Sequence, residues 1–434
     1  MYEEIREKTG DEEIAQERRA LLVAVYKGPA YLEECEEHLD ELELLCETYG
    51  IETVGKFPCQ VRKFNASTLI TSGKVEEIDE RAKELGVDVI VFDDEIAPSQ
   101  QRNLEKIYNI PVIDRSEVII GVFAQRAHSK EAKLQVELAR LKYLSPRLKR
   151  MWTHLSRQQA TAGGGAYLKG KGEKQIEIDR RLLKTRISQL QKEINSVHAH
   201  RDTQRVQRER SEIPTFAIVG YTNAGKSTLL NALTEAGIFT EDKLFATLDT
   251  TTRKFTLPNN QDILLTDTVG FIRKLPHLLV AAFRSTLVEA VQADIIIHLI
   301  DASHQTALEQ AEATIDVLNE LGAKDKPVIT ALNKIDQLED MTVLKKLRTR
   351  FPKTVQISAL KKQGFDELIE LMEEELKKRR RVVSLRIPQK DYAVVSEVMR
   401  HGNILDQDYE ENDVIIRVDM PAQHIGRVKQ YLDE

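Results

Sequence analysis

Residues 220–227 read Gly-Tyr-Thr-Asn-Ala-Gly-Lys-Ser, which is the G-x-x-x-x-G-K-[ST] pattern of a phosphate-binding loop. The apolar run 216–219 predicts a short buried strand before the loop, and residues 227–233 predict a helix after it. Glycines at 220 and 225 let successive backbone N–H groups face phosphate oxygens beside a positive helix N-terminus. Because the pattern lies between a strand and a helix, a chance match in a glycine-containing turn is the weaker explanation.

Two side chains of this loop have expected roles in nucleotide chemistry. Lys226 is expected to reach the β- and γ-phosphates, and the Ser227 hydroxyl is expected to ligate Mg²⁺. The nucleotide contacts expected from the loop are Gly220, Tyr221, Thr222, Asn223, Ala224, Gly225, Lys226 and Ser227.

Two segments downstream match the switch segments of a GTPase. Asp267-Thr-Val-Gly270 follows an apolar run, so Asp267 can hold Mg²⁺ through a water and the Gly270 N–H can bond the γ-phosphate. Upstream of it, Thr247 is the candidate Mg²⁺ ligand on a switch loop, although threonines 250, 251 and 252 follow directly. Lys226, Thr247 and Gly270 are therefore the candidate catalytic residues, and Ser227 and Thr247 are the candidate metal ligands. The nucleotide contacts expected here are Phe245, Ala246, Thr247, Leu248, Asp249, Asp267, Thr268, Val269 and Gly270.

Two further segments predict which base is bound. Asp336 follows a predicted strand and can accept hydrogen bonds from guanine N1–H and the 2-amino group. Adenine lacks both donors and would leave a buried carboxylate unpaired, at a cost of about 1–3 kcal/mol or more. A backbone N–H of the segment 358–360 can meet the guanine oxygen. An ATP-using phosphate-loop domain is the alternative, and the segment 333–336 argues against it. The base contacts expected are Asn333, Lys334, Ile335, Asp336, Ser358, Ala359 and Leu360.

Phe271 directly follows Gly270, where many small GTPases place a glutamine that orients the attacking water. A phenyl ring neither donates nor accepts a conventional hydrogen bond. We therefore predict slow hydrolysis by the free protein and strong stimulation by a macromolecular partner.

Length and composition indicate a multidomain protein. The chain has 434 residues, of which 41% are apolar and 31% are charged, and its net charge is −7. Three cysteines without C-x-x-C spacing predict neither a disulfide nor structural zinc.

The first residues are acidic and no apolar run approaches the roughly 18 residues that span a bilayer, so we expect no secretory signal and no membrane segment. A cytoplasmic monomer is the expectation.

Hydrophobic periodicity divides the chain into four predicted domains. Residues 1–129 alternate strands (21–25, 87–92 and 111–114) with helices (31–49 and 98–108), which predicts an α/β domain; residues 71–74 are expected to form a turn. Residues 130–210 carry two leucine-rich seams, which predict a long antiparallel helical hairpin. Residues 211–379 predict a GTPase domain with a mostly parallel sheet. Residues 380–434 predict a small α+β domain with strands 382–387 and 413–418, a helix 392–401 and another helix after Pro421.

The hairpin is strongly basic. Residues 142–186 hold 12 Lys and Arg against 3 Asp and Glu, a net charge of +9 that leaves −16 for the rest of the chain. Arg147 is one of these basic residues, and Trp152, His154 and Tyr167 lie among them, suited to stacking on unpaired bases. RNA contact at the hairpin tip is the functional interpretation. A solvated helical face with a mobile loop, or an arm for an acidic groove on another protein, are the alternatives. The candidate RNA contacts are Gly163, Gly164, Gly165, Lys169, Lys171 and Lys174.

The order of these domains resembles the HflX family of ribosome-associated GTPases over about residues 20–380. The motifs that carry the resemblance are residues 220–227, 245–249 and 267–271, together with the hairpin segments 163–165, 170–173 and 175–183. The hairpin segments are independent of the general GTPase motifs, which makes the resemblance specific. Phe271 also fits, because this family carries a hydrophobic residue there.

The resemblance implies a GTPase that uses Mg²⁺ and binds the large (50S) ribosomal subunit, with the glycine loop near rRNA of the peptidyl-transferase region. Family members are implicated in separating or rescuing stalled ribosomes under heat or other stress. Lys171 and Lys174 stand where the family usually has proline and threonine, and Thr250 replaces a usual proline, which should loosen that switch. The alternative function is a GTP-dependent signalling or scaffold switch whose hairpin binds a protein partner.

Overall fold

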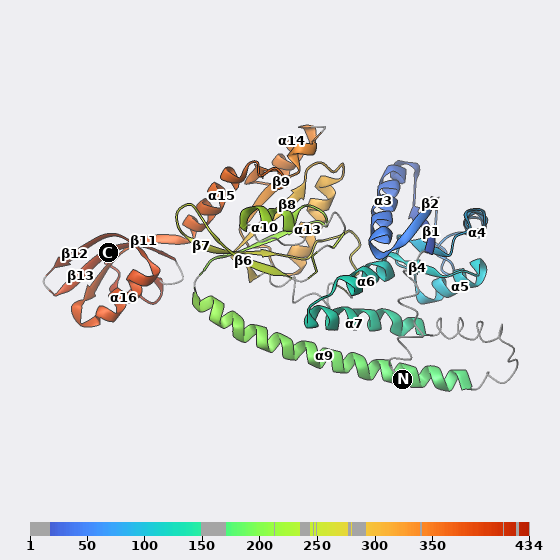
Figure 1. The fold of residues 1–434 in the computed structure, drawn as a ribbon, viewed down its shortest axis with the longest axis horizontal. Helices are drawn as coiled ribbons and strands as arrows, with labels where there is room; N and C mark the ends of the chain where they lie inside the picture. Colours follow the sequence, from blue (N-terminus) through green and yellow to red (C-terminus); the bar gives the residue numbers. More distant parts are fainter. Residues whose placement is uncertain are drawn as a thin grey trace.

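A computed structural model describes most of the chain as four consecutive units, which agree with the predicted fold class (Figure 1). The described residues are 18–148, 171–211, 213–234, 244–245, 247–248, 250–276, 279, 292–338, 341–410, 412–421 and 425–433. No helix within these ranges combines the length and the apolar character needed to cross a membrane.

The N-terminal unit is a four-stranded parallel sheet in the order β2-β1-β3-β4. Leu22 on the first strand packs with the helices of one face, whereas the adjacent Leu21 packs with those of the other. Both faces of the sheet are therefore buried, which explains why the strands read as continuous apolar runs. The elements are β1 (Arg18–Tyr26), α3 (Leu32–Tyr49), β2 (Ile51–Gln60), α4 (Ser72–Leu85), β3 (Val89–Phe92), α5 (Pro98–Tyr108), β4 (Val112–Asp114) and α6 (Arg115–Arg126).

Two elements of this unit differ from the sequence expectation. The predicted turn at 71–74 is wrong, because Thr71 is the N-cap of α4 and the helix begins at the next residue. Val75, Ile78 and Ala82 bury one face of this helix. Strand β2 was not predicted; it lies at the edge of the sheet, where partial exposure weakens the apolar pattern.

The helices α7 (Lys130–Leu144) and α9 (Lys171–Ser211) run antiparallel beside each other, as predicted for the hairpin (Figure 1). Their seam is a cluster of buried aliphatic side chains, and Arg186 donates to both carboxylate oxygens of Glu137 at 2.9 and 3.0 Å. The cluster consists of Leu134, Leu138, Leu141, Leu148, Leu183, Leu190 and Ile194.

The end of α7 is anchored in the N-terminal unit. Arg147 is buried, and its guanidinium donates to the carbonyl of Ile96 at 2.8 Å and to Gln101 Oε1 at 3.1 Å. It also pairs with Asp114 at 3.4 Å, which accepts from the Tyr143 hydroxyl as well. Arg147, which was counted among the basic residues of the hairpin, is therefore not a surface charge. It joins the hairpin to the N-terminal sheet instead.

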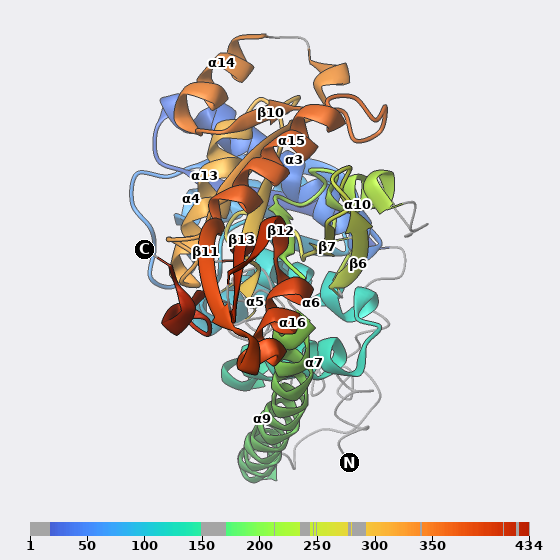
Figure 2. The same cartoon turned by 90° about the vertical axis from the view of Figure 1, so that its left-hand side faces the viewer.

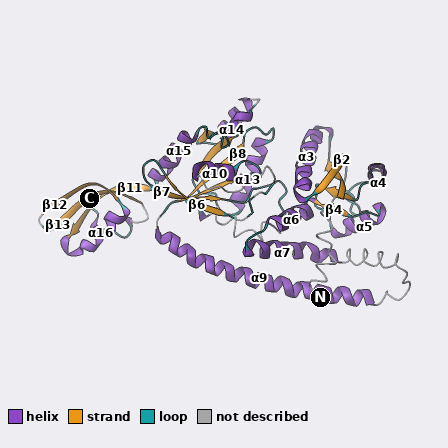
Figure 3. Cartoon of the chain, in the orientation of Figure 1, coloured by secondary structure: helices purple, strands orange, loops and turns teal. Residues whose placement is uncertain are grey.

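The third unit is a six-stranded sheet in the order β10-β9-β8-β5-β7-β6, parallel except for β6. Figure 3 shows strands of this sheet among the helices of the unit. Along β5, Phe216 and Ile218 pack in the cluster that contains α10 and α15, whereas Ala217 and Val219 face the opposite side. The elements are β5 (Thr215–Gly220), α10 (Lys226–Thr234), β6 (Thr251–Thr256), β7 (Asp262–Asp267), β8 (Ile295–Asp301), α13 (Ala307–Glu320), β9 (Val328–Asn333), α14 (Met341–Arg350), β10 (Thr354–Gln356) and α15 (Phe365–Lys378).

The C-terminal unit is an antiparallel sheet in the order β11-β13-β12 that packs one helix on one face (Figure 2). Its elements are β11 (Arg380–Pro388), α16 (Tyr392–His401), β12 (Asn403–Glu410) and β13 (Asp413–Pro421). The largely exposed edge strand β12 was not predicted. Of the helix expected after Pro421, residues 422–424 lie outside the described residues; Ile425 is helical, and a short 3₁₀ helix, Lys429–Tyr431, follows.

Candidate nucleotide-binding site

The predicted nucleotide segments meet at one edge of the six-stranded sheet. Strands β5, β7, β8 and β9 are parallel neighbours, so the loops after them leave from the same edge. The switch residue Thr247 reaches this edge too, because its hydroxyl lies 2.7 Å from that of Ser227. Ala246 and Asp249 lie outside the described residues.

The glycines of the phosphate loop are required by close approach. A Cβ on Gly220 would lie 2.2 Å from the carbonyl oxygen of Leu299 on β8. Gly225 has a φ of +93°, and a Cβ there would lie 2.5 Å from Nδ2 of Asn333. Larger residues at either position would push the loop away from the neighbouring strands.

Lys226 lies folded along the inside of the loop. Its ammonium donates to the carbonyl oxygens of Tyr221 at 2.8 Å and Gly220 at 3.3 Å. Burial lowers the pKa of Lys226 to about 8, although Asp267 opposes that shift. A Cβ on Gly270 would lie 2.9 Å from this ammonium, so the lysine and the glycine predicted to meet the γ-phosphate are neighbours.

Three oxygen donors gather beside Lys226. The Ser227 hydroxyl contacts the Thr247 hydroxyl at 2.7 Å and donates to Asp267 Oδ2 at 2.6 Å. Asp267 is fully buried, and burial raises the pKa of its carboxyl group while Lys226 opposes the rise. Its second oxygen, Oδ1, is buried without a hydrogen-bond partner among the described residues.

Asn333 holds three loops together. Its Nδ2 donates to the carbonyl of Ala224 in the phosphate loop at 2.8 Å, and its Oδ1 accepts from the N–H of Ala359 at 2.9 Å. The Ala359 N–H is therefore used within the protein. The asparagine acts on the architecture of the site, a role that the sequence pattern alone did not show.

The residues predicted to read the base follow β9 directly. Lys334 adopts a left-handed backbone conformation with a φ of 60°, and its ammonium pairs with Asp301 at 2.7 Å. A hydrogen bond with Ser358 holds the pKa of Asp336 below its usual range, with Lys361 3.6 Å away as a further contribution. Asp336 is thus an ionised acceptor at neutral pH. Leu360 has a side chain that is mostly exposed.

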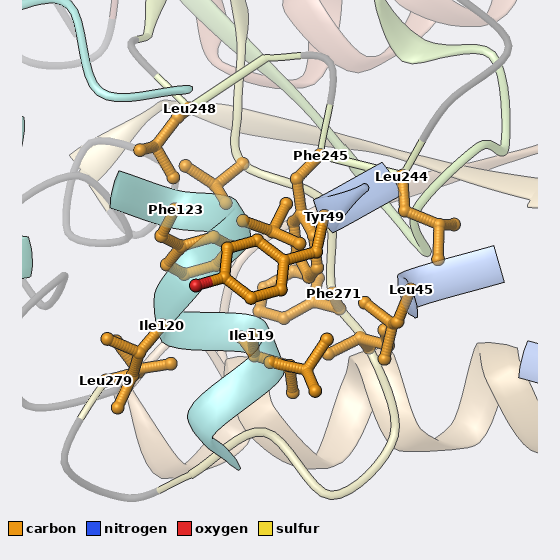
Figure 4. Packing of buried hydrophobic residues seen from close by; sticks show 14 of the residues in the cluster. Leu45, Tyr49, Ile119, Ile120, Phe123, Leu244, Phe245, Leu248, Phe271 and Leu279 are labelled. Atoms are coloured by element: carbon orange, nitrogen blue, oxygen red, sulfur yellow. The ribbon is translucent and has the colours of Figure 1, made fainter. Parts of the chain in front are cut away.

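Phe271 is buried in a hydrophobic cluster shared with the N-terminal unit (Figure 4). The switch side chains Phe245 and Leu248 belong to the same cluster, where Phe245 meets Phe123 of α6 edge to face at 4.5 Å between ring centroids. The Phe271 ring therefore joins the predicted switch segments to the neighbouring unit. Tyr49 of α3 is a further member.

Charged residues surround this cluster, and sequence reasoning missed them. Asp93, at the end of β3, accepts from Arg115 at 2.8 Å, Arg273 at 3.2 Å and Lys274 at 2.8 Å. Glu41 on α3 accepts from the hydroxyl of Tyr221 at 2.6 Å. The only local signal was an acidic residue after a predicted strand, which does not identify its partners.

Of the candidate RNA contacts, the structure describes only part. Lys171 and Lys174 lie in the first turn of α9, where the backbone is described and the side chains are not. Gly163, Gly164, Gly165 and Lys169 lie outside the described residues.

Three sequence families match successive parts of the chain. Residues 36–124 match a family described as GTP-binding GTPase N-terminal, and residues 126–208 match the GTP-binding GTPase Middle Region. Residues 215–334 match a family described as 50S ribosome-binding GTPase.

The similarity to known proteins extends over nearly the whole chain. A protein named GTPase HflX from Chlamydia pneumoniae is 45% identical over 406 residues, covering 93% of this chain and 86% of the relative. GTPase HflX from Akkermansia muciniphila is 44% identical over 441 residues, 99% of each chain, and that from Escherichia coli (strain K12) is 41% identical over 387 residues, 89% of this chain and 90% of the relative. Among solved structures, a GTP-binding protein from the archaeon Sulfolobus solfataricus in complex with GDP is 26% identical, covers 83% of this chain and 99% of that chain, and has a TM-score of 0.41.

Proposed function

This chain belongs to the HflX family of GTPases, and on that premise we propose that it is a GTP-hydrolysing factor of the large ribosomal subunit that separates or rescues stalled ribosomes under stress. The observation that carries the proposal is the assembly of phosphate, switch and base-reading segments at one sheet edge, in a chain whose hairpin is strongly basic. The match of residues 215–334 to a 50S ribosome-binding GTPase family supports the choice of partner.

The residues of the site have distinct roles toward GTP. Lys226 would exchange its contacts with two loop carbonyls for the β- and γ-phosphates, which compensate a buried ammonium better. The Gly270 N–H would meet the γ-phosphate, and Asp336 would accept from guanine. Loss of the γ-phosphate would then release the segment that begins at Gly270.

The donor set beside Lys226 fits Mg²⁺. Ser227, Thr247 and Asp267 offer only oxygen atoms, the ligands that this ion prefers, and the unpartnered Asp267 Oδ1 is buried among them. Ser227 and Thr247 would hold the ion directly, and Asp267 would hold it through a water. When bound, Mg²⁺ neutralises charge that develops on the phosphates.

We infer slow hydrolysis by the free protein. The Phe271 ring is committed to the cluster shared with the N-terminal unit and offers no hydrogen bond to an attacking water. Purified 50S subunits should therefore raise single-turnover GTP hydrolysis by about 10-fold or more, since positioning one reactant is worth that much. A free protein that already hydrolyses GTP at tens per second, and is unaffected by subunits, would contradict this part.

The hairpin tip is the proposed contact with rRNA. It combines Gly163, Gly164 and Gly165 with Lys169, Lys171 and Lys174, so the backbone can approach phosphates closely and the lysines can neutralise them. Hypothesis: the GTP-bound protein grips the subunit, and hydrolysis releases it.

Gradient sedimentation with 50S subunits tests this cycle. We expect the protein to co-migrate with the subunit when GTP or a non-hydrolysable analogue is present and to lose this co-migration with GDP. Equal co-migration with all three nucleotides would contradict the proposed cycle. A triple variant, Lys169→Glu, Lys171→Glu and Lys174→Glu, should lose co-migration and keep its affinity for GTP. Lys192→Glu is the matched control, because this exposed lysine lies on the same helix away from the tip.

Salt dependence distinguishes rRNA contact from a protein partner. Each phosphate contact lowers the logarithm of the binding constant by about 0.7–0.9 per tenfold rise in salt. A steep slope that flattens in the triple lysine variant supports rRNA contact. A shallow slope that is the same for the original protein and for the triple lysine variant would favour a signalling or scaffold switch with a protein partner.

A further inference from the structure

The side chain of Tyr221, the second residue of the phosphate loop, reaches the N-terminal unit. The Tyr221 side chain is buried, and its hydroxyl accepts a hydrogen bond from the backbone N–H of Arg273 at 2.6 Å while it donates to Glu41 Oε2 at 2.6 Å. We propose that Tyr221 is a positioning residue for GTP hydrolysis, which fixes the segment after Gly270 between the phosphate loop and the N-terminal unit.

The backbone places Gly270 between two sets of contacts. Upstream, β7 pairs with β5 in parallel register up to Asp267. Downstream, Phe271 donates to the carbonyl of Gly220 at 3.0 Å and accepts from the N–H of Thr222 at 2.7 Å. The Arg273 N–H, which is held by Tyr221, is the next contact along the chain. The tyrosine hydroxyl therefore limits how far the segment that carries the Gly270 N–H can shift.

A closed circuit of polar contacts links this hydroxyl to the N-terminal unit. Glu41 pairs with Arg115, and Arg115 pairs with Asp93 at 2.8 Å. Asp93 in turn accepts from the guanidinium of Arg273 at 3.2 Å, which returns the circuit to the residue whose N–H bonds Tyr221. Because Arg115 and Asp93 are 2% and 1% exposed, water competes little for these contacts.

The chemistry requires a hydroxyl at this position. Only a group that donates and accepts at once can bridge a carboxylate and an N–H, and phenylalanine can do neither. Burial raises the pKa of Tyr221, while Arg115 and the Arg273 N–H oppose the rise, so the phenol keeps its proton for Glu41. Tyr221→Phe thus removes both hydrogen bonds and leaves the ring in place.

Single-turnover GTP hydrolysis by the full chain without ribosomes tests the proposal, which rests on membership of the GTPase family and not on a ribosomal partner. We expect Tyr221→Phe to lower the rate by roughly 10- to 100-fold, since misplacing a reacting group carries costs up to that order. The ratio of the affinities for a non-hydrolysable GTP analogue and for GDP should fall too, because only the analogue meets Gly270. Tyr431→Phe is the matched control, since it removes a hydroxyl hydrogen-bonded to Asp391 at 3.1 Å in the C-terminal unit.

Glu41→Gln provides the second arm. If Tyr221 acts through the circuit, this variant also slows hydrolysis, and the double variant is no slower than the slower single variant. The proposal is overturned if Tyr221→Phe hydrolyses GTP at the original rate. It is equally overturned if the variant loses affinity for GDP and for the analogue by the same factor with a lower melting temperature, because the hydroxyl would then serve stability alone.

Discussion

Asn333 Nδ2 donates to the carbonyl oxygen of Ala224 at 2.8 Å and so joins the loop predicted to read the base to the loop predicted to bind phosphate. The same amide accepts from Ala359 through its oxygen. One buried side chain thereby sets the distance between the two ends of the nucleotide site. Changes that displace this amide should weaken GTP and GDP binding alike.

Gly225→Ala should abolish nucleotide binding. The new Cβ would lie 2.5 Å from Asn333 Nδ2, at a φ of +93° that alanine rarely adopts. Gly322→Ala is the control, because its φ is +91° and no atom lies within 4 Å of the added Cβ. The control should lose about 1 kcal/mol of unfolding free energy from backbone strain alone and bind GDP normally. Calorimetric titration with GDP measures the affinity of each variant for the nucleotide. Similar affinities in the two variants would contradict the role of the close contact.

Asp336→Asn should exchange guanine specificity for xanthine specificity. The carboxylate is expected to accept from the guanine 2-amino group, whereas an amide nitrogen could donate to the oxygen that xanthine carries there. We expect the affinity for GDP to fall by about 10-fold or more and that for XDP to rise. Competition between the two nucleotides checks this. A variant that keeps its preference for GDP would show that another group reads the 2-position.

Asp93→Asn should strongly destabilise the contact between the first and third units. The carboxylate faces Arg115, Arg273 and Lys274. Its removal leaves the buried Arg115 poorly compensated, at a cost of about 3–5 kcal/mol, whereas the more exposed Arg273 and Lys274 contribute less. The neighbouring Asp94→Asn loses one partly exposed pair with Lys274 and should cost about 1 kcal/mol or less. Urea unfolding followed by fluorescence compares the two midpoints, and equal midpoints would argue against a buried network.

Lowering the pH should destabilise the fold through protonation of His298. This imidazole on β8 is fully buried, and burial lowers its pKa to about 4; neither ring nitrogen has a hydrogen-bond partner among the described residues. The unfolded chain binds the proton at about pH 6.5 and the folded chain does not. Stability should therefore fall as pH drops from about 6.5 to 4, by about 3 kcal/mol. The variant His298→Leu should lack this part of the decline, and parallel pH profiles for the two proteins would contradict it.

Local patterns predicted many of the elements. The helix Pro98–Tyr108 has the predicted limits, because proline starts it and its apolar spacing ends at the tyrosine. The nucleotide segments were located by local spacing too, since phosphate binding demands glycines, a lysine and a hydroxyl at fixed positions; their contact with a nucleotide stays a prediction. The edge strands β2 and β12 were missed, because half-exposed residues carry little apolar periodicity.

The sequence by itself determined the type of most buried elements and placed the phosphate-loop pattern between a strand and a helix, because these depend on residues a few positions apart. Only the tertiary structure decided that Phe271 packs between two units and that Tyr221 meets Glu41, 180 positions away in the chain. The reason is physical. A hydrogen bond between distant residues depends on how whole sheets and helices pack, and it leaves no periodic trace along the sequence.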